Sequence, residues 1–172
     1  MDTICAECHR LGNGCCSLTD TEGKFQIGIF AEDIYRIEMH TSFRRNYFVV
    51  KDKVTDEILD FLSNTNYSLF NNIFYNNNRL KLQTINGNCI FLKENGCCLS
   101  TNVRPLYCRV YPFWPSKNYQ NIYILSSNDC LAQEESTLDW TIVNKHFRYS
   151  EEYLYGLFEE MKKCSNDIDI LV

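Results

Sequence analysis

No stretch of the sequence approaches the roughly 20 consecutive apolar residues that a membrane-spanning helix needs, so we expect no membrane partner. An excess of positive charge is also missing, because the net charge is −5 and the pI is near 5.2. This balance argues against a general nucleic-acid binder. The segment from Met1 to Ile4 has neither the basic start nor the apolar stretch of a secretory signal, so we expect a cytoplasmic protein.

Several motifs of catalysis are missing as well. The sequence has no glycine-rich phosphate loop, no G-x-G-x-x-G, and no C-x3-C-x2-C of the kind found in radical S-adenosylmethionine enzymes. Only three histidines are present, and no pair of them has zinc-finger spacing. No His or Asn partner for a nucleophilic cysteine is identifiable. These absences leave the cysteines as the main candidates for chemistry.

Cysteine is abundant, with ten in 172 residues, and most of them fall into two groups. The first group opens the chain as C-x2-C-x6-C-C, and the second lies between residues 89 and 108, with Cys130 just behind it. The two groups are Cys5, Cys8, Cys15 and Cys16, and then Cys89, Cys97, Cys98 and Cys108. In a reducing compartment such clusters indicate metal binding or redox chemistry before disulfides. Thiolates select soft or borderline metals, which here means zinc or iron–sulfur.

Length and composition predict one globular domain over residues 1–172, with 45% hydrophobic and 14% aromatic residues. The apolar patterns predict a strand over 25–29, helices over 31–40 and 54–62, a strand at 122–124, and helices over 137–148 and 150–164. We expect Asp52 or Thr55 to cap the second helix, and Ser150 to begin the last one. The expected fold is α+β: a small Cys-rich, metal-centred single domain with a short β-hairpin and peripheral helices.

Turns are expected to position the second cysteine group. Asn86-Gly87 between two apolar runs is typical of a hairpin, which would hold Cys89 just past the turn. A second turn at residues 94–96 would deliver Cys97 and Cys98. Three prolines, Pro105, Pro112 and Pro115, prevent long regular structure over residues 103–116.

The second group carries a resemblance to a known family. The matching residues between positions 89 and 115 are Cys89-Ile90-Phe91-Leu92, Gly96, Cys98, Arg104-Pro105, Cys108-Arg109 and Tyr111-Pro112-Phe113-Trp114-Pro115. With these residues the segment resembles the YkgJ-like family, which is also called the CxxCxxCC or zinc- or iron-chelating domain family. The resemblance covers roughly residues 5–130, and Asp33 matches the acidic position of the family. Cys97 is extra relative to the family pattern, so either Cys97 or Cys98 is the ligand. The residues C-terminal to this Cys-rich part, at 137–164, are expected to be helical.

The resemblance implies a metal-chelating domain. The ligands it implies are Cys5, Cys8, Cys15, Cys16, Cys89, Cys98, Cys108 and Cys130, although which four share one metal is left open. A [4Fe–4S] cluster is favoured over Zn²⁺, because the donors are nearly all Cys and the aromatic shell at Tyr107, Tyr111, Phe113 and Trp114 would exclude water. Cys164, alone near the end of the last helix, is expected to be a plain thiol.

The same cysteine domain occurs in flagellin lysine methylases, so the resemblance implies two classes of function. As an enzyme, the protein would be an S-adenosylmethionine-dependent protein lysine methyltransferase with a protein substrate, or an iron–sulfur oxidoreductase. The alternative is a non-catalytic, metal-stabilised module that binds a partner or handles metal. The oligomeric state is left open. Cys5-Ala6-Glu7-Cys8-His9 also matches the c-type haem attachment motif, but haem attachment normally requires export.

Arg104, Arg109 and Tyr111 are candidate cofactor-binding residues. Arg104 and Arg109 flank Cys108, where they could donate hydrogen bonds to cluster sulfurs or bind an anionic substrate group. Alternatively, both arginines satisfy backbone carbonyls in a loop that the prolines interrupt. The sequence does not decide between these two roles.

Overall fold

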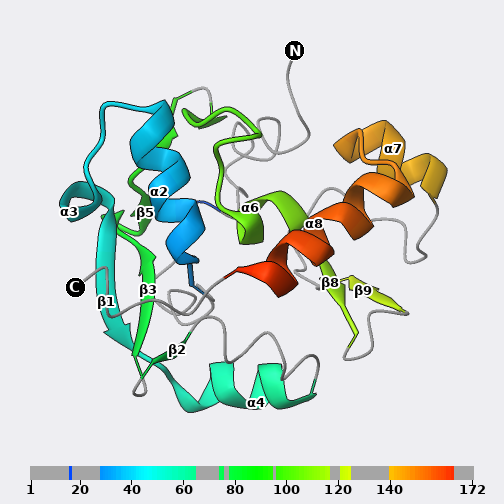
Figure 1. Ribbon diagram of the computed structural model, residues 1–172, viewed down its shortest axis with the longest axis horizontal. Coiled ribbons are helices and arrows are strands. Elements are labelled where there is room, and N and C mark those ends of the chain that lie inside the picture. The colour runs from blue at the N-terminus through cyan, green and yellow to red at the C-terminus, as the bar shows by residue number, and fades with distance from the viewer. Residues whose placement is uncertain are drawn as a thin grey trace.

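The computed structural model describes residue 16 and the ranges 28–64, 74–75, 78–94, 96–116, 121–124 and 140–164. The helices are α2 (Ala31–His40), α3 (Arg45–Phe48), α4 (Asp56–Asn64), α6 (Leu106–Val110), α7 (Trp140–Phe147) and α8 (Glu151–Lys163). The strands are β1 (Val49–Lys53), β2 (Phe74–Tyr75), β3 (Asn78–Leu82), β4 (Thr84–Ile85), β5 (Asn88–Cys89), β6 (Leu92–Lys93), β7 (Gly96–Cys97), β8 (Phe113–Pro115) and β9 (Ile122–Ile124). Helices and short antiparallel strand pairs together confirm the predicted α+β class (Figure 1).

One three-stranded antiparallel sheet, in the order β1-β3-β2, lies beneath α2 (Figure 1). Val49 of β1 pairs with Leu82 of β3, so β1 runs the full length of β3. The predicted strand over 25–29 is wrong at residues 28 and 29, while residues 25–27 lie outside the described ranges. Gly28 has a φ of 153°, a conformation that glycine adopts readily and that interrupts an extended segment. Ile29 nevertheless donates one backbone hydrogen bond of 2.8 Å to the carbonyl of Leu80.

The helices follow the sequence patterns closely at three places. The predicted helix over 31–40 is α2, with Ile34 and Ile37 buried on one face. Thr55 precedes α4, and its carbonyl accepts the first helical hydrogen bonds, but its buried hydroxyl has no hydrogen-bond partner among the described residues. Asp52 lies in β1, so neither side chain provides the predicted cap. Ser150 begins α8, because its side chain accepts a hydrogen bond from the amide of Tyr153.

Two hydrophobic clusters form the interior. The α8 core consists of Phe30, Ile58, Leu106, Tyr107, Val110, Phe113, Trp114, Leu154, Leu157, Phe158, Met161 and Cys164. The α2 core consists of Ile29, Ile34, Ile37, Phe48, Leu80, Leu82, Cys89, Ile90, Phe91, Leu99 and Val103. The short helix α6 packs against α8 near the middle of the molecule (Figure 1). The second cysteine group therefore lies on elements that belong to both cores.

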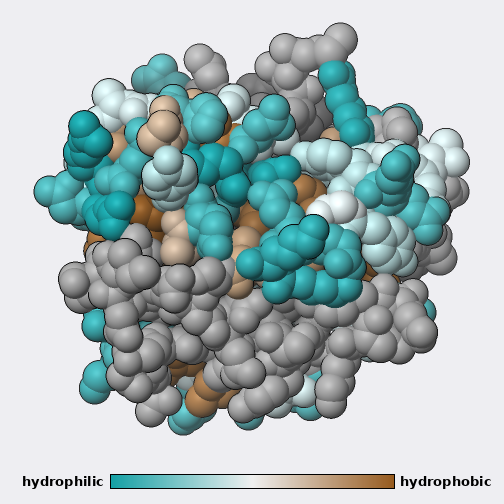
Figure 2. Space-filling view, in the orientation of Figure 1, coloured by the Kyte–Doolittle hydropathy of each residue, from teal (hydrophilic) through white to brown (hydrophobic). Residues whose placement is uncertain are grey.

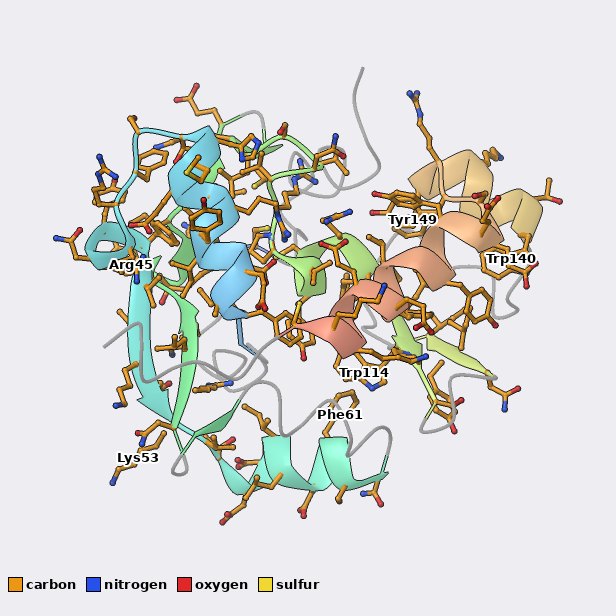
Figure 3. The ribbon with its side chains drawn as sticks, in the orientation of Figure 1. Arg45, Lys53, Phe61, Trp114, Trp140 and Tyr149 are labelled. Carbon is orange, nitrogen blue, oxygen red and sulfur yellow. The ribbon has the colours of Figure 1, made fainter. Side chains whose placement is uncertain are left out.

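The α8 core is rich in aromatic rings. Phe61 of α4 points toward Trp114 of β8, with ring centroids 5.6 Å apart (Figure 3). The view in Figure 2 shows a mainly hydrophilic surface over α2 and α8, which places the polar sides of these two helices toward solvent. Of the helices in the described ranges, none is both long enough and apolar enough to cross a bilayer.

Candidate metal centre

A tight hairpin positions Cys89, as the Asn-Gly pattern predicts. Asn86 and Gly87 have φ values of 52° and 77°, which two-residue turns with φ > 0 at both central positions require. The turn pairs Ile85 with Asn88 and Thr84 with Cys89. Cys89 is thereby held on a short strand, and its side chain is buried in the α2 core.

A second turn returns the chain to the same place. Lys93 pairs with Gly96 and Leu92 with Cys97, and Gly96 has a φ of 97°. The backbone amide of Cys98 then donates a 2.8 Å hydrogen bond to the carbonyl of Phe91. Cys97 packs against the α2 core beside Cys89, whereas Cys98 is exposed. Two consecutive turns thus return the chain from Cys89 to Cys97 and Cys98, which follow Cys89 by eight and nine residues in the sequence.

The three thiols influence one another electrostatically. Burial raises the pKa of Cys89 to about 11, and the neighbouring Cys97 and Cys98 raise it further, against a backbone hydrogen bond from Phe91 that lowers it. The pKa of Cys98 is also raised, first by burial and then by Cys97, while Lys93 and Arg104 act in the opposite direction. Cys97 and Cys98 therefore lie within electrostatic range of Cys89.

The first cysteine group meets the second at one point within the described ranges. The amide of Cys89 donates a 2.8 Å hydrogen bond to the carbonyl of Cys16, and Cys16 packs against the α2 core. The two groups are 73 residues apart at these positions, so the fold brings together what the sequence separates. The other predicted ligands Cys5, Cys8, Cys15 and Cys130 lie outside the described residues.

Cys108 lies on α6, and its side chain is exposed. Within the described ranges, no three or more His, Cys, Asp or Glu side chains form a group that could hold a metal ion. The described cysteines by themselves therefore do not form a complete metal site. Cys89, Cys97 and Cys98 are free thiols, and so is Cys164 at the end of α8.

The surroundings of these sulfurs fit a thiophilic metal. The amide of Phe91 is directed to the sulfur of Cys89, and backbone N–H groups of this kind stabilise thiolate charge in metal and cluster sites. Lys93 and Arg104 supply positive charge near Cys98. Thiolates are soft donors, so zinc and iron–sulfur clusters suit this donor set better than magnesium or calcium.

Arg104 and Arg109, the predicted cofactor-binding arginines, are both engaged by the protein. Arg104 Nε donates a 3.1 Å hydrogen bond to the carbonyl of Leu99, as expected for an arginine that satisfies a backbone carbonyl. Arg109 lies 3.4 Å from Glu160 and 3.5 Å from the hydroxyl of Tyr153. Tyr111, the third candidate, is half-buried directly after α6.

A buried acid on α2 was not predicted as a site residue, although its match to the family pattern was a signal. Asp33 is fully buried, and it accepts hydrogen bonds from the amides of Phe30 and Leu106 and from Arg36. Burial raises the pKa of Asp33 to about 6, although Arg36 and the two amides act to lower it.

Glu160 of α8 makes ion pairs with arginines of two other helices. Its carboxylate lies 3.1 Å from Arg36 and 3.4 Å from Arg109, so it joins α2 and α6 to α8. No pattern in the sequence reveals this role, because a Glu-Glu pair on an amphipathic helix is usually solvated.

A comparison with protein families identifies the cysteine-rich part of the chain. Residues 4–131 match the CxxCxxCC family, which is described as "Putative zinc- or iron-chelating domain". No curated protein and no solved structure matches the chain. The matched range contains all eight predicted ligands and ends before α7. Because the match spans more than half of the chain, this protein belongs to the CxxCxxCC family of zinc- or iron-chelating domains.

Proposed function

We propose that the protein chelates zinc or iron through its two cysteine groups. The observation that carries this proposal is the gathering of Cys89, Cys97 and Cys98 by two tight turns, with the backbone of Cys16 bonded to Cys89. The proposed ligands are Cys5, Cys8, Cys15, Cys16, Cys89, Cys98, Cys108 and Cys130, with Cys97 as the alternative to Cys98. A reducing compartment such as the cytoplasm would keep these thiols available.

Within this function, a [4Fe–4S] cluster is favoured over zinc. The donors are thiols, and clusters of this type use Cys ligands. Cys108 adjoins Tyr107, which stacks between Phe30 and Trp114 with centroid distances of 5.1 Å and 5.5 Å. These rings cover the inner side of α6, whereas the thiol of Cys108 itself is exposed, so the preference for a cluster rests on the donor set.

The activity that we propose for such a centre is redox chemistry or the modification of a protein substrate. Methyl transfer to a protein lysine would require S-adenosylmethionine, and Arg104, Arg109 and Tyr111 would then lie near the cofactor. The proximity of Arg104 to Cys98 supports an arginine at the centre.

A second candidate is a non-catalytic, metal-stabilised module. The engagement of Arg109 by Glu160 and Tyr153 favours it, because an arginine held by the protein is not available to a substrate anion. A structural site has four protein ligands, whereas a catalytic site keeps an open position.

Metal analysis tests these proposals directly. We expect anaerobically purified protein to be brown, to contain iron and acid-labile sulfide, and to lose both in the variants Cys89→Ser and Cys108→Ser. The matched control is Cys164→Ser, which removes a thiol outside the proposed centre. Colourless protein with stoichiometric zinc and no sulfide would refute the cluster and retain chelation. Protein without zinc or iron would refute chelation itself. Calorimetric titration with S-adenosylmethionine separates a methyltransferase from the module.

A further inference from the structure

The helix that carries Cys108 cannot hold its own orientation. α6 has five residues, and isolated helices of that length are unstable because nucleation costs more than a few hydrogen bonds return. Pro105 occupies the N-cap position and provides no side-chain hydrogen bond to the first turn. The direction in which Cys108 points must therefore be set by other elements.

The carboxylate of Asp33 binds the beginning of α6. Asp33 Oδ1 accepts a 3.0 Å hydrogen bond from the amide of Leu106, which is 73 residues away in sequence. Asp33 Oδ2 accepts a 3.1 Å hydrogen bond from the amide of Phe30. An acid from α2 thus provides the capping that the N-terminus of α6 lacks locally.

Further contacts tie the other end of α6 to the same network. Arg36 bonds to Asp33, to the carbonyl of Arg104 at 3.3 Å, and to Glu160 at 3.1 Å. Glu160 in turn lies 3.4 Å from Arg109, one residue after Cys108. The hydroxyl of Tyr149 donates a 2.6 Å hydrogen bond to the carbonyl of Arg109. Both ends of α6 are therefore held by α2 and α8.

We propose that Asp33 is a positioning residue for the metal ligand Cys108. Its carboxylate fixes the start of α6, and through Arg36 and Glu160 it restrains the residue that follows the ligand. The inference rests on the proposed metal function, because it assigns Asp33 a role toward a ligand of that centre. Asp33 itself does not touch the metal.

The variant Asp33→Asn tests this role with little change in shape. The Asn amide keeps one acceptor oxygen, but its NH₂ group would face one of the donors that Asp33 now binds, so at least one hydrogen bond is lost. Residues that orient a metal ligand typically change metal affinity by about 10- to 100-fold when they are replaced. The matched control is Glu38→Gln, which removes the ion pair with Arg45 from the same helix, away from α6.

The measurement is a titration of the full-length, metal-free protein with Co²⁺ under anaerobic conditions. Sulfur-to-cobalt charge-transfer absorption reports how many thiolates bind each ion, and circular dichroism reports whether the variant is folded. We expect folded Asp33→Asn to bind Co²⁺ about 10- to 100-fold more weakly than the wild type does. Its charge-transfer intensity should be reduced in the same way as that of Cys108→Ser. Glu38→Gln should match the wild type.

The possible outcomes separate the two proposals. Suppose that Cys108→Ser lowers the charge-transfer intensity but folded Asp33→Asn keeps the Co²⁺ affinity and the intensity of the wild type. This result would overturn the positioning role of Asp33 and leave the proposed metal function standing. If the wild type showed no thiolate binding of Co²⁺ and also contained neither zinc nor iron after anaerobic purification, the proposed metal function would be overturned, and the positioning role with it. If Asp33→Asn does not fold, Glu160→Gln decides, because it breaks the link between Arg36 and Arg109 at a half-exposed position. A loss of Co²⁺ affinity in Glu160→Gln that is measurable, although smaller than the loss expected for Asp33→Asn, supports the role. An unchanged Co²⁺ affinity in Glu160→Gln overturns it.

Discussion

The burial of Asp33 should make the stability of the protein depend on pH in a way that Asp33→Asn removes. The pKa of this carboxyl is raised from its ordinary value of 3.8 to about 6, chiefly by burial. The groups that face it are Arg36 on its own helix and Glu160 and Cys164 from α8. Between these two pH values the folded protein binds a proton that the unfolded chain has already released.

The sign follows from this difference in bound protons. The contribution of Asp33 to the free energy of unfolding is fully present below pH 3.8 and is lost as the pH rises to about 6. At ~1.4 kcal/mol per pH unit, the loss is about 3 kcal/mol. Glu38 should behave in the opposite way, because its hydrogen bonds with Arg45 lower its pKa, so its contribution is lost as the pH falls.

Urea unfolding of the wild type, Asp33→Asn and Glu38→Gln at several pH values between 3.5 and 7.5 measures these effects. We expect the stability of the wild type relative to Asp33→Asn to fall by about 3 kcal/mol across this range. The stability relative to Glu38→Gln should rise. If the difference for Asp33→Asn also rose with pH, the hydrogen bonds from Arg36 and the two amides would outweigh burial, and the reasoning would be refuted.

Three further predictions concern the turns, the caps and the thiols. Gly87→Ala should destabilise the protein by about 1–2 kcal/mol, because the φ of 77° disfavours any side chain, and it should weaken metal binding by loosening the hairpin before Cys89. Gly156→Ala, where an added Cβ meets nothing within 4 Å, should instead stabilise α8 by up to ~1 kcal/mol. Denaturant unfolding measures both variants, and equal effects on stability would contradict this contrast. Ser150→Ala should cost about 1 kcal/mol in the same assay and Ser150→Asp much less, since only Ala lacks an acceptor for the helix amide; an unchanged midpoint for Ser150→Ala would argue against the cap. Cys164→Ser should keep its metal, whereas Cys108→Ser should lose it; metal analysis that gave the reverse would show that the ligand assignment is wrong.

Local patterns in the sequence were sufficient for much of the fold. The apolar spacing of α2 and α8 and the Asn86-Gly87 turn each depend on neighbouring residues, and the structure contains all three. The strand β1 was missed, because Val49 and Val50 are followed by three charged residues and the strand is stabilised by pairing with β3. Its place in a sheet is a tertiary effect that no local pattern carries.

The candidate site was predictable where it depended on turns and unpredictable where it depended on long-range contacts. The hairpin over residues 84–89 placed Cys89 correctly beside its turn. The bonds of Asp33 to Leu106 and of Glu160 to Arg36 join residues 73 and 124 positions apart. Such pairs follow from how helices pack, and neither residue type nor spacing indicates them.

The boundary of the family match has a consequence for anyone who dissects this protein. The match ends at residue 131, yet α8 contributes Leu154, Leu157, Phe158 and Met161 to the core that covers α6. A fragment that stopped at residue 131 would expose the inner side of α6 and leave Arg36 and Arg109 without the carboxylate of Glu160. We therefore expect the family segment and α8 to unfold as one cooperative unit, so that a stable fragment would have to extend beyond residue 131.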